Sequence, residues 1–180
     1  MSYELISHTT VSGTTTNYID IQSIPQTYQD LCFWWAGRAN GTTARNSVDF
    51  YLRFNNDSTT EYGNVLQWAK GTTRYAGFST SGTQIAWSGW PGSASYSNNQ
   101  AASLFGYIPG YRNTTNYQGH HVYMQAGSSA TASEGSSDSR AGMWLGQWHV
   151  EQAINRIEIG FPYETYAPNS TFTLYGVKNS

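Results

Sequence analysis

Hydrophobic and polar residues alternate along several segments of the chain. In the clearest case, the segment 47–54, the apolar residues Val48, Phe50, Leu52 and Phe54 occupy every second position. Successive side chains of a β-strand point to opposite faces of the sheet. Each such segment therefore predicts a strand with one face on a core and the other in solvent.

Alternating patterns, or runs of β-branched and aromatic residues, recur along the whole chain between clusters of Gly, Asn, Ser and Thr. They predict candidate strands at 3–11, 18–24, 31–38, 48–54, 65–69, 74–78, 84–87, 103–111, 119–124, 141–150, 154–159 and 172–177. We expect some candidates to be loops, which leaves eight to ten strands. The predicted fold is all-β: a two-sheet antiparallel sandwich, jelly-roll-like, with a closed barrel as the lesser option. No window predicts a convincing helix; the best candidate, 97–104, would form one or two turns.

Two stretches contain few residues that could build a core. Segment 79–100 mixes Ser and Gly with isolated aromatic residues, and segment 126–139 has no aromatic or large aliphatic residue. Loops of this length inside a compact domain are typically functional or mobile. No repeat, heptad pattern or linker divides the chain, so residues 1–180 are predicted to form one sandwich domain. Within it, residues 1–11 are expected to be an N-terminal arm or an edge strand.

The composition narrows the class of protein. Only 11% of the residues are charged, against about a quarter in typical proteins, and this disfavours an amphipathic helical bundle. The 16% of aromatic residues can offset the entropy of ordering the chain, which disfavours disorder. A net charge of −2 with only two lysines gives no surface for nucleic acid.

The N-terminus has neither a basic region nor an apolar core, so we expect no signal peptide. No apolar stretch reaches the roughly 18 residues that span a bilayer, so no membrane association is expected. We therefore expect synthesis in a cytoplasm. The lone cysteine, Cys32, lies in an apolar run and is predicted to be a buried thiol.

Candidate catalytic groups are scattered. Asp49 and Glu158 occupy outward positions of alternating strands, where solvated or ion-paired carboxylates are expected. His120 and His121 are adjacent in a strand, point to opposite faces and cannot share a metal. No nucleophile elbow, phosphate-binding glycine loop or zinc-protease motif occurs. We therefore predict no catalytic residues, no metal site and no cofactor. A glycan-degrading enzyme would need two carboxylates in one cleft.

Aromatic residues are better candidates for binding, because they stack on sugar rings and form hot spots of protein interfaces. Trp144 and Trp148 are four residues apart and share a face, which predicts core positions, whereas Trp34 and Trp35 must face opposite ways. We assign the interface or ligand contacts to Trp35, Trp87, Trp90 and Tyr96. The alternative is that these side chains merely fill the interior of the sandwich.

Five segments resemble, in order, β-sandwich proteins encoded among the virion genes of cyanophages and other tailed bacteriophages. They are YIDIQSIPQTYQDL (18–31), YLRFNND (51–57), YRNTTNY (111–117), AINRI (153–157) and STFTLYGV (170–177). The resemblance spans almost the whole chain and ends in the STFTLYG-type strand. The two long segments poor in core residues and the Phe33-Trp34-Trp35 cluster depart from the pattern.

The resemblance implies a viral structural protein located in the virion, either a capsid decoration (cement) protein or a module of the tail. The chain starts at Met1 without a coiled-coil shaft, which favours a compact decoration protein over a whole fibre. Such proteins commonly form homotrimers and contact the major capsid protein. The alternative function is a carbohydrate-binding module of the tail or fibre that stacks host surface glycan on Trp87, Trp90 and Tyr96.

Overall fold

The computed structural model describes residues 1–13, 16–41, 49–87, 101–115, 119–128 and 140–178. This part of the chain contains twelve strands and no helix. The strands are β1 (Ser2–Thr10), β2 (Tyr18–Ile21), β3 (Asp30–Gly37), β4 (Phe50–Phe54), β5 (Tyr62–Lys70), β6 (Thr73–Gly82), β7 (Ile85–Trp87), β8 (Ala102–Ile108), β9 (His120–Ser128), β10 (Arg140–Trp148), β11 (Ile157–Gly160) and β12 (Thr171–Lys178). Within the same residues, no helix is long and apolar enough to cross a membrane.

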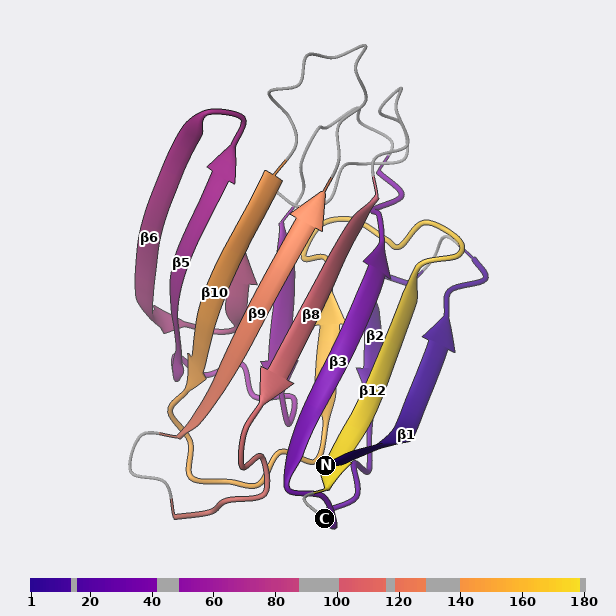
Figure 1. The fold of residues 1–180 in the computed structure, drawn as a ribbon, viewed down its shortest axis with the longest axis vertical. Helices are drawn as coiled ribbons and strands as arrows, with labels where there is room; N and C mark the ends of the chain where they lie inside the picture. Colours follow the sequence, from indigo (N-terminus) through magenta and orange to yellow (C-terminus); the bar gives the residue numbers. More distant parts are fainter. Residues whose placement is uncertain (14–15, 42–48, 88–100, 116–118, 129–139, 179–180) are drawn as a thin grey trace.

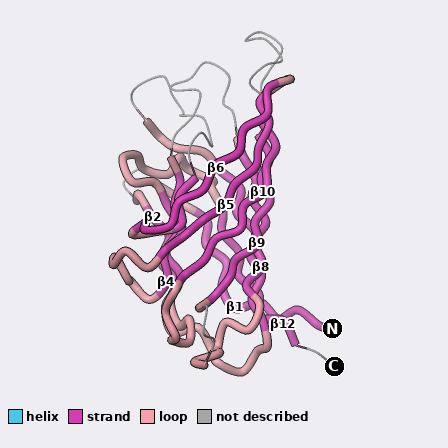
Figure 2. The backbone as a smooth tube through the Cα atoms, turned by 90° about the vertical axis from the view of Figure 1, so that its left-hand side faces the viewer, coloured by secondary structure: helices cyan, strands magenta, loops and turns pink. Residues whose placement is uncertain are grey.

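The strands form two antiparallel sheets that face each other. The larger sheet has eight strands in the order β1-β12-β3-β8-β9-β10-β5-β6, and the smaller has four in the order β2-β11-β4-β7. The eight-stranded sheet lies in front in Figure 1, and Figure 2 shows the two layers from the side. The predicted all-β, two-sheet antiparallel sandwich is confirmed.

Eight of the twelve strands have the arrangement of a jelly roll. One half is β1-β12-β3-β8 and the other is β2-β11-β4-β7, with the chain crossing between the sheets along its course. The remaining strands are two insertions, β5 and β6 between β4 and β7, and β9 and β10 between β8 and β11. Both insertions extend the larger sheet beyond its jelly-roll half (Figure 1).

The expected number of eight to ten strands was too low. All twelve candidate segments contain a strand, because the two inserted pairs find hydrogen-bonding partners at the side of the larger sheet. Parts of the predicted loops are also strand: β6 includes residues 79–82, and β9 runs to Ser128. The candidate helix at 97–104 is wrong at its C-terminal end, where Ala102 begins β8. Its residues 97–100 lie outside the described part.

The space between the sheets is filled by aliphatic side chains together with clusters of aromatic rings. Trp35 packs on Phe50 at a centroid distance of 4.6 Å, and Phe50 packs on Phe161 at 5.1 Å. A second cluster surrounds Trp148, whose ring stacks against Tyr62. Trp144 and Trp148 are both buried, as predicted from their spacing.

Close contact between strands β3 and β8 requires a glycine in the core. Gly106 is the cross-strand partner of Phe33 and is buried. A Cβ atom at this position would overlap the Phe33 ring, which stacks on Phe172 at 5.5 Å. The absent side chain of Gly106 therefore makes room for this aromatic pair.

We expect Gly106→Ala to lower the free energy of unfolding by about 1–3 kcal/mol, because the extra methyl group forces the Phe33 ring out of its position. Gly127→Ala is the matched control, since its Cβ would meet no atom closer than 4.0 Å. The control should change stability by no more than about 0.5 kcal/mol. Urea denaturation of both variants measures the difference, and equal stabilities would contradict the packing described.

Candidate functional site

A continuous row of side chains crosses the outward face of the eight-stranded sheet. Each member is the cross-strand partner of the next, from one edge of the sheet to the other. In this order the members are Leu5, Tyr175, Cys32, Tyr107, Tyr123, Leu145, Val65 and Phe78. None of them is charged. We call this row the apolar band.

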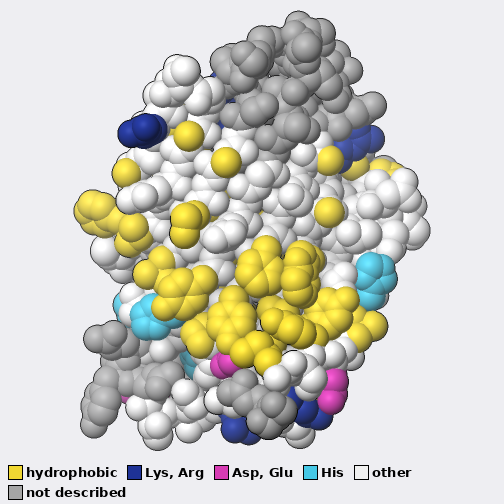
Figure 3. Space-filling model, viewed as in Figure 1, with side chains coloured by type: hydrophobic (Ala, Val, Ile, Leu, Met, Phe, Trp, Pro, Cys, Tyr) yellow, Lys and Arg dark blue, Asp and Glu magenta, His cyan; other side chains and the backbone are white. Residues whose placement is uncertain are grey.

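Much of the apolar band is open to solvent. Phe78 is 79% exposed, Leu5 59% and Tyr123 54%. Trp34 and Met143 lie in the next row of the same face and are also exposed. Figure 3 shows a large hydrophobic patch on this face, with further hydrophobic side chains scattered over the rest of it. Large exposed apolar patches of this kind mark interaction sites on soluble proteins.

Cys32 is the one buried member of the band, as the sequence predicted. Its cross-strand partners are Tyr107 and Tyr175, one on each side. Burial raises the pKa of its thiol to about 11, so the group stays protonated and unreactive at neutral pH. Cys32 is therefore a packing residue of the band.

The inserted strands supply half of the band. Tyr123 lies on β9, Leu145 on β10, Val65 on β5 and Phe78 on β6. Sequence reasoning missed all four residues. A signal for them exists in pairs such as Val65-Leu66 and Trp144-Leu145, where consecutive apolar residues give a strand two apolar faces.

The structure places Trp35, which was predicted to make contacts, in the core. It is only 2% exposed and packs against Phe50 in the core, whereas Trp34 is 44% exposed on the outward face. The pair does face opposite ways, as predicted, but β3 begins at Asp30 in a register that turns Leu31, Phe33 and Trp35 inward.

The other predicted contact residues lie elsewhere. Trp87 ends β7 in the four-stranded sheet, where it pairs with Phe50. Trp90 and Tyr96 lie outside the described residues. The two described members of the set, Trp35 and Trp87, thus lie in different sheets.

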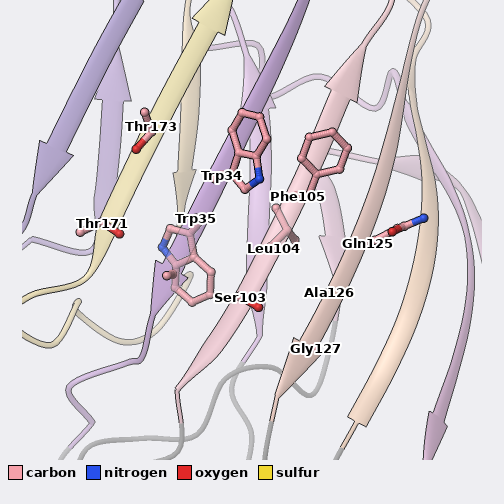
Figure 4. A pocket seen from close by; sticks show the side chains of 11 residues that line it. Trp34, Trp35, Ser103, Leu104, Phe105, Gln125, Ala126, Gly127, Thr171 and Thr173 are labelled. Atoms are coloured by element: carbon pink, nitrogen blue, oxygen red, sulfur yellow. The ribbon is translucent and has the colours of Figure 1, made fainter. Parts of the chain in front are cut away.

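A shallow hollow opens beside Trp34 on this same face. Its side is formed by the Trp34 and Phe105 rings, which Figure 4 shows next to each other. Polar side chains around it are Ser103 and Gln125 from β8 and β9, and Thr171 and Thr173 from β12. Small residues such as Ala36 and Gly127 line it as well. We call this feature the Trp34 hollow.

The outward face of the four-stranded sheet has the opposite character. Asp20, Glu158 and Arg53 form a cross-strand row there. Tyr51 Oη donates to Glu158 Oε1 at 2.6 Å, and Arg53 Nη1 donates to the same oxygen at 3.2 Å. Glu158 is thus ion-paired, as expected, although it is buried rather than solvated.

Arg156 completes this charged row by holding Asp20. Arg156 Nε and Nη2 donate to the two oxygens of Asp20 at 2.7 and 3.0 Å. Partial burial raises the pKa of Asp20, but the hydrogen bonds from Arg156 and Gln22 outweigh it, so the pKa is lowered overall. Two acids and two arginines are thereby paired, which is the arrangement of a structural network rather than of a proton donor.

His120 is also a structural group. Its ring is buried against Trp148, and its Nε2–H donates to the backbone carbonyl of Gln152 at 2.6 Å. Burial lowers the pKa of His120 below its ordinary value. Among the described residues, no group of three His, Cys, Asp or Glu side chains could hold a metal ion.

Comparison with known proteins identifies no family. No family model matches the chain, and no curated protein matches it. Among solved structures, the infectious bursal disease virus VP2 subviral particle gives a TM-score of 0.16 at 9% identity, and the Gx strain of that virus gives 0.11 at 10%. The alignments cover 97% and 98% of this chain but 40% and 41% of those chains. The chain thus spans less than half of their length, and TM-scores this low carry no inference about fold or function.

The buried position of His120 predicts a pH dependence of stability. In the unfolded chain, the side chain of His120 takes up a proton as the pH falls through the ordinary pKa of histidine, about 6.5. In the folded chain it takes up this proton only at a lower pH, because burial lowers its pKa. Stability is therefore highest above pH 6.5 and falls as the pH drops below it. Thermal unfolding between pH 7.5 and pH 5, roughly one to two pH units around that pKa, measures this loss.

His120→Gln should flatten this part of the pH profile, because glutamine keeps a donor for the Gln152 carbonyl but does not titrate. His149→Gln is the control, since His149 is exposed, and should retain the wild-type profile. Parallel profiles for the wild type and His120→Gln would refute the role given to His120.

Proposed function

We propose that this chain is a non-enzymatic structural protein of a phage virion, most simply a capsid decoration protein. In this proposal the chain assembles as a homotrimer and contacts the major capsid protein. Two observations support it. The sequence resemblance supports a place among virion proteins. The apolar band supports a role in protein contacts, because it crosses all eight strands without a charged residue.

The band has the chemistry of a permanent contact. The cores of protein interfaces are poor in charge and rich in aromatic residues, and Tyr107, Tyr123, Tyr175 and Phe78 of the band provide such side chains here. Left in water, this surface would favour non-specific association. We therefore assign the band to contacts between copies of the chain.

The size of the band fits a contact that is one of several. Strands about 4.8 Å apart make it roughly 34 Å long, and a row about 7 Å wide then covers roughly 230 Å². A standard interface buries about 800 Å² on each partner. The band thus supplies less than a third of such an interface, and the other contacts of a closed oligomer supply the remainder.

The charged groups support a structural rather than a catalytic role. Glu158 is held by Tyr51 and Arg53, and Asp20 by Arg156. Asp30 accepts hydrogen bonds from the Tyr107 hydroxyl and from the backbone N–H of Gly110. Each of these carboxylates is thus held by hydrogen bonds within the protein. Jelly rolls serve both viral capsid and lectin domains, so the fold is compatible with this proposal without selecting it.

Native mass spectrometry tests the proposed assembly. We expect the wild type to show three times the 20.0 kDa mass of the chain and to co-sediment with phage heads assembled without it. Tyr123→Glu places a charge in the middle of the band, where it would be desolvated on assembly. This variant should shift to monomers, because burying an unpaired carboxylate costs several kcal/mol.

Tyr163→Glu is the matched control, because Tyr163 is 83% exposed and lies outside the band. It should keep the wild-type mass and head binding. A wild-type chain that is monomeric and does not bind heads would refute the proposal. An oligomer that tolerates Tyr123→Glu would show that the band is not the contact.

A further inference from the structure

Going beyond the proposed place in a virion, we propose that the Trp34 hollow is a binding site for a neutral glycan, with Trp34 as the platform on which a sugar ring stacks. The sequence placed a glycan platform at Trp87, Trp90 and Tyr96. The structure instead presents a half-exposed tryptophan on the larger sheet, beside a hollow with hydrogen-bonding side chains.

The Trp34 ring is held in a defined orientation. It packs against the Phe105 ring at a centroid distance of 5.0 Å and edge-on against Tyr175 at 5.3 Å. The ring nevertheless remains 44% exposed. A fixed, partly exposed indole is a suitable stacking surface, because little side-chain entropy is lost when a ligand binds to it.

The polar side chains around the hollow have unused hydrogen-bonding capacity. In the part of the chain that the structure describes, the side chains of Ser103, Thr171 and Gln125 make no hydrogen bond to another residue. Thr173 differs, because its hydroxyl is bonded to His8 Nδ1 at 2.8 Å. Hydroxyl and amide groups both donate and accept, which matches the hydroxyl groups of a sugar.

The charge and backbone of the site argue against other ligands. None of the described residues that line the Trp34 hollow is Asp, Glu, Lys or Arg, so these residues offer an anionic ligand no counter-charge. Strands β3, β8 and β9 lie inside the sheet, where their backbone groups already pair with neighbouring strands. An extended peptide therefore cannot bind here by adding a strand, as it would at a sheet edge.

The site extends beyond a single sugar ring. A second hollow on the same face shares Gln125 and Ala126 with the first and continues across β10 to β6. It adds the amide of Gln67, the side chain of Tyr75 and one charged residue, Arg74 on β6. The two adjoining hollows run across the strands, so their shape suits an oligosaccharide laid perpendicular to them.

The hollow adjoins the apolar band at Trp34, whose ring touches Tyr175 of the band, and extends away from it. The floor of the hollow includes Ala36 and Ser103, which pair with each other four residues along the strands from the Cys32–Tyr107 pair of the band. Four residues of a strand correspond to about 13 Å. An assembly through the band can therefore leave the hollow accessible, and glycan binding does not depend on the proposed virion role.

The test is a glycan array that carries neutral and acidic oligosaccharides, followed by calorimetric titration with the best neutral hit. We expect neutral hits only. Trp34→Ala should weaken binding at least about tenfold, as truncation of an aromatic hot spot does, whereas Trp34→Tyr should retain most of the affinity. Ser103→Phe, which fills the hollow and leaves the platform intact, should also abolish binding.

Tyr163→Ala is the control, since it removes an exposed ring outside the site and should bind like the wild type. Thermal unfolding and native mass spectrometry of each variant separate loss of the site from loss of fold or assembly. The absence of any neutral hit overturns the proposal, and so does binding that survives both Trp34→Ala and Ser103→Phe. Either result leaves the oligomer test of the virion role unaffected.

Discussion

The rest of the structure depends on the antiparallel register of the eight-stranded sheet. Because a strand turns alternate side chains to opposite faces, burying Leu31, Phe33 and Trp35 of β3 turns Cys32 and Trp34 outward. Because β3 pairs with β12 and β8, its register also determines which side chains of these neighbouring strands face outward. A shift of one residue would exchange the two faces, so the core and the apolar band are fixed by the same constraint.

The two inserted strand pairs change what the jelly roll can present. A jelly roll of two four-stranded sheets would have outward faces of similar width, whereas β5, β6, β9 and β10 double the width of one sheet. These strands also carry Tyr123, Leu145, Val65 and Phe78, so the added width is largely apolar. The insertions thus turn one side of a sandwich into a broad, largely apolar surface.

Charge is divided between the two sides of the molecule. The four-stranded sheet places Asp20, Glu158, Arg53 and Arg156 on its outward face, where they pair with one another. The band on the opposite sheet has no charged member. With only 11% charged residues in the chain, pairing these groups on the smaller sheet leaves the apolar band free of the desolvation cost that a buried interface would impose.

The sequence by itself determined the class of fold and the positions of the strands. Alternation of hydrophobic and polar residues indicates which segments are extended strands with one buried face. This signal is local in the sequence, and all twelve candidate segments contain a strand. Burial of Trp144, Trp148 and Cys32 followed from the same patterns. The choice between Trp34 and Trp35 did not, because two adjacent tryptophans satisfy either register.

Only the tertiary structure decided where the apolar band and the Trp34 hollow lie. The apolar band joins residues from position 5 to position 175, and they become neighbours only through pairings between strands distant in sequence. The Trp34 hollow likewise needs β12, β3, β8 and β9 side by side. Alternation within one strand shows that a residue faces outward, but the order of strands in the sheet decides which outward residues meet.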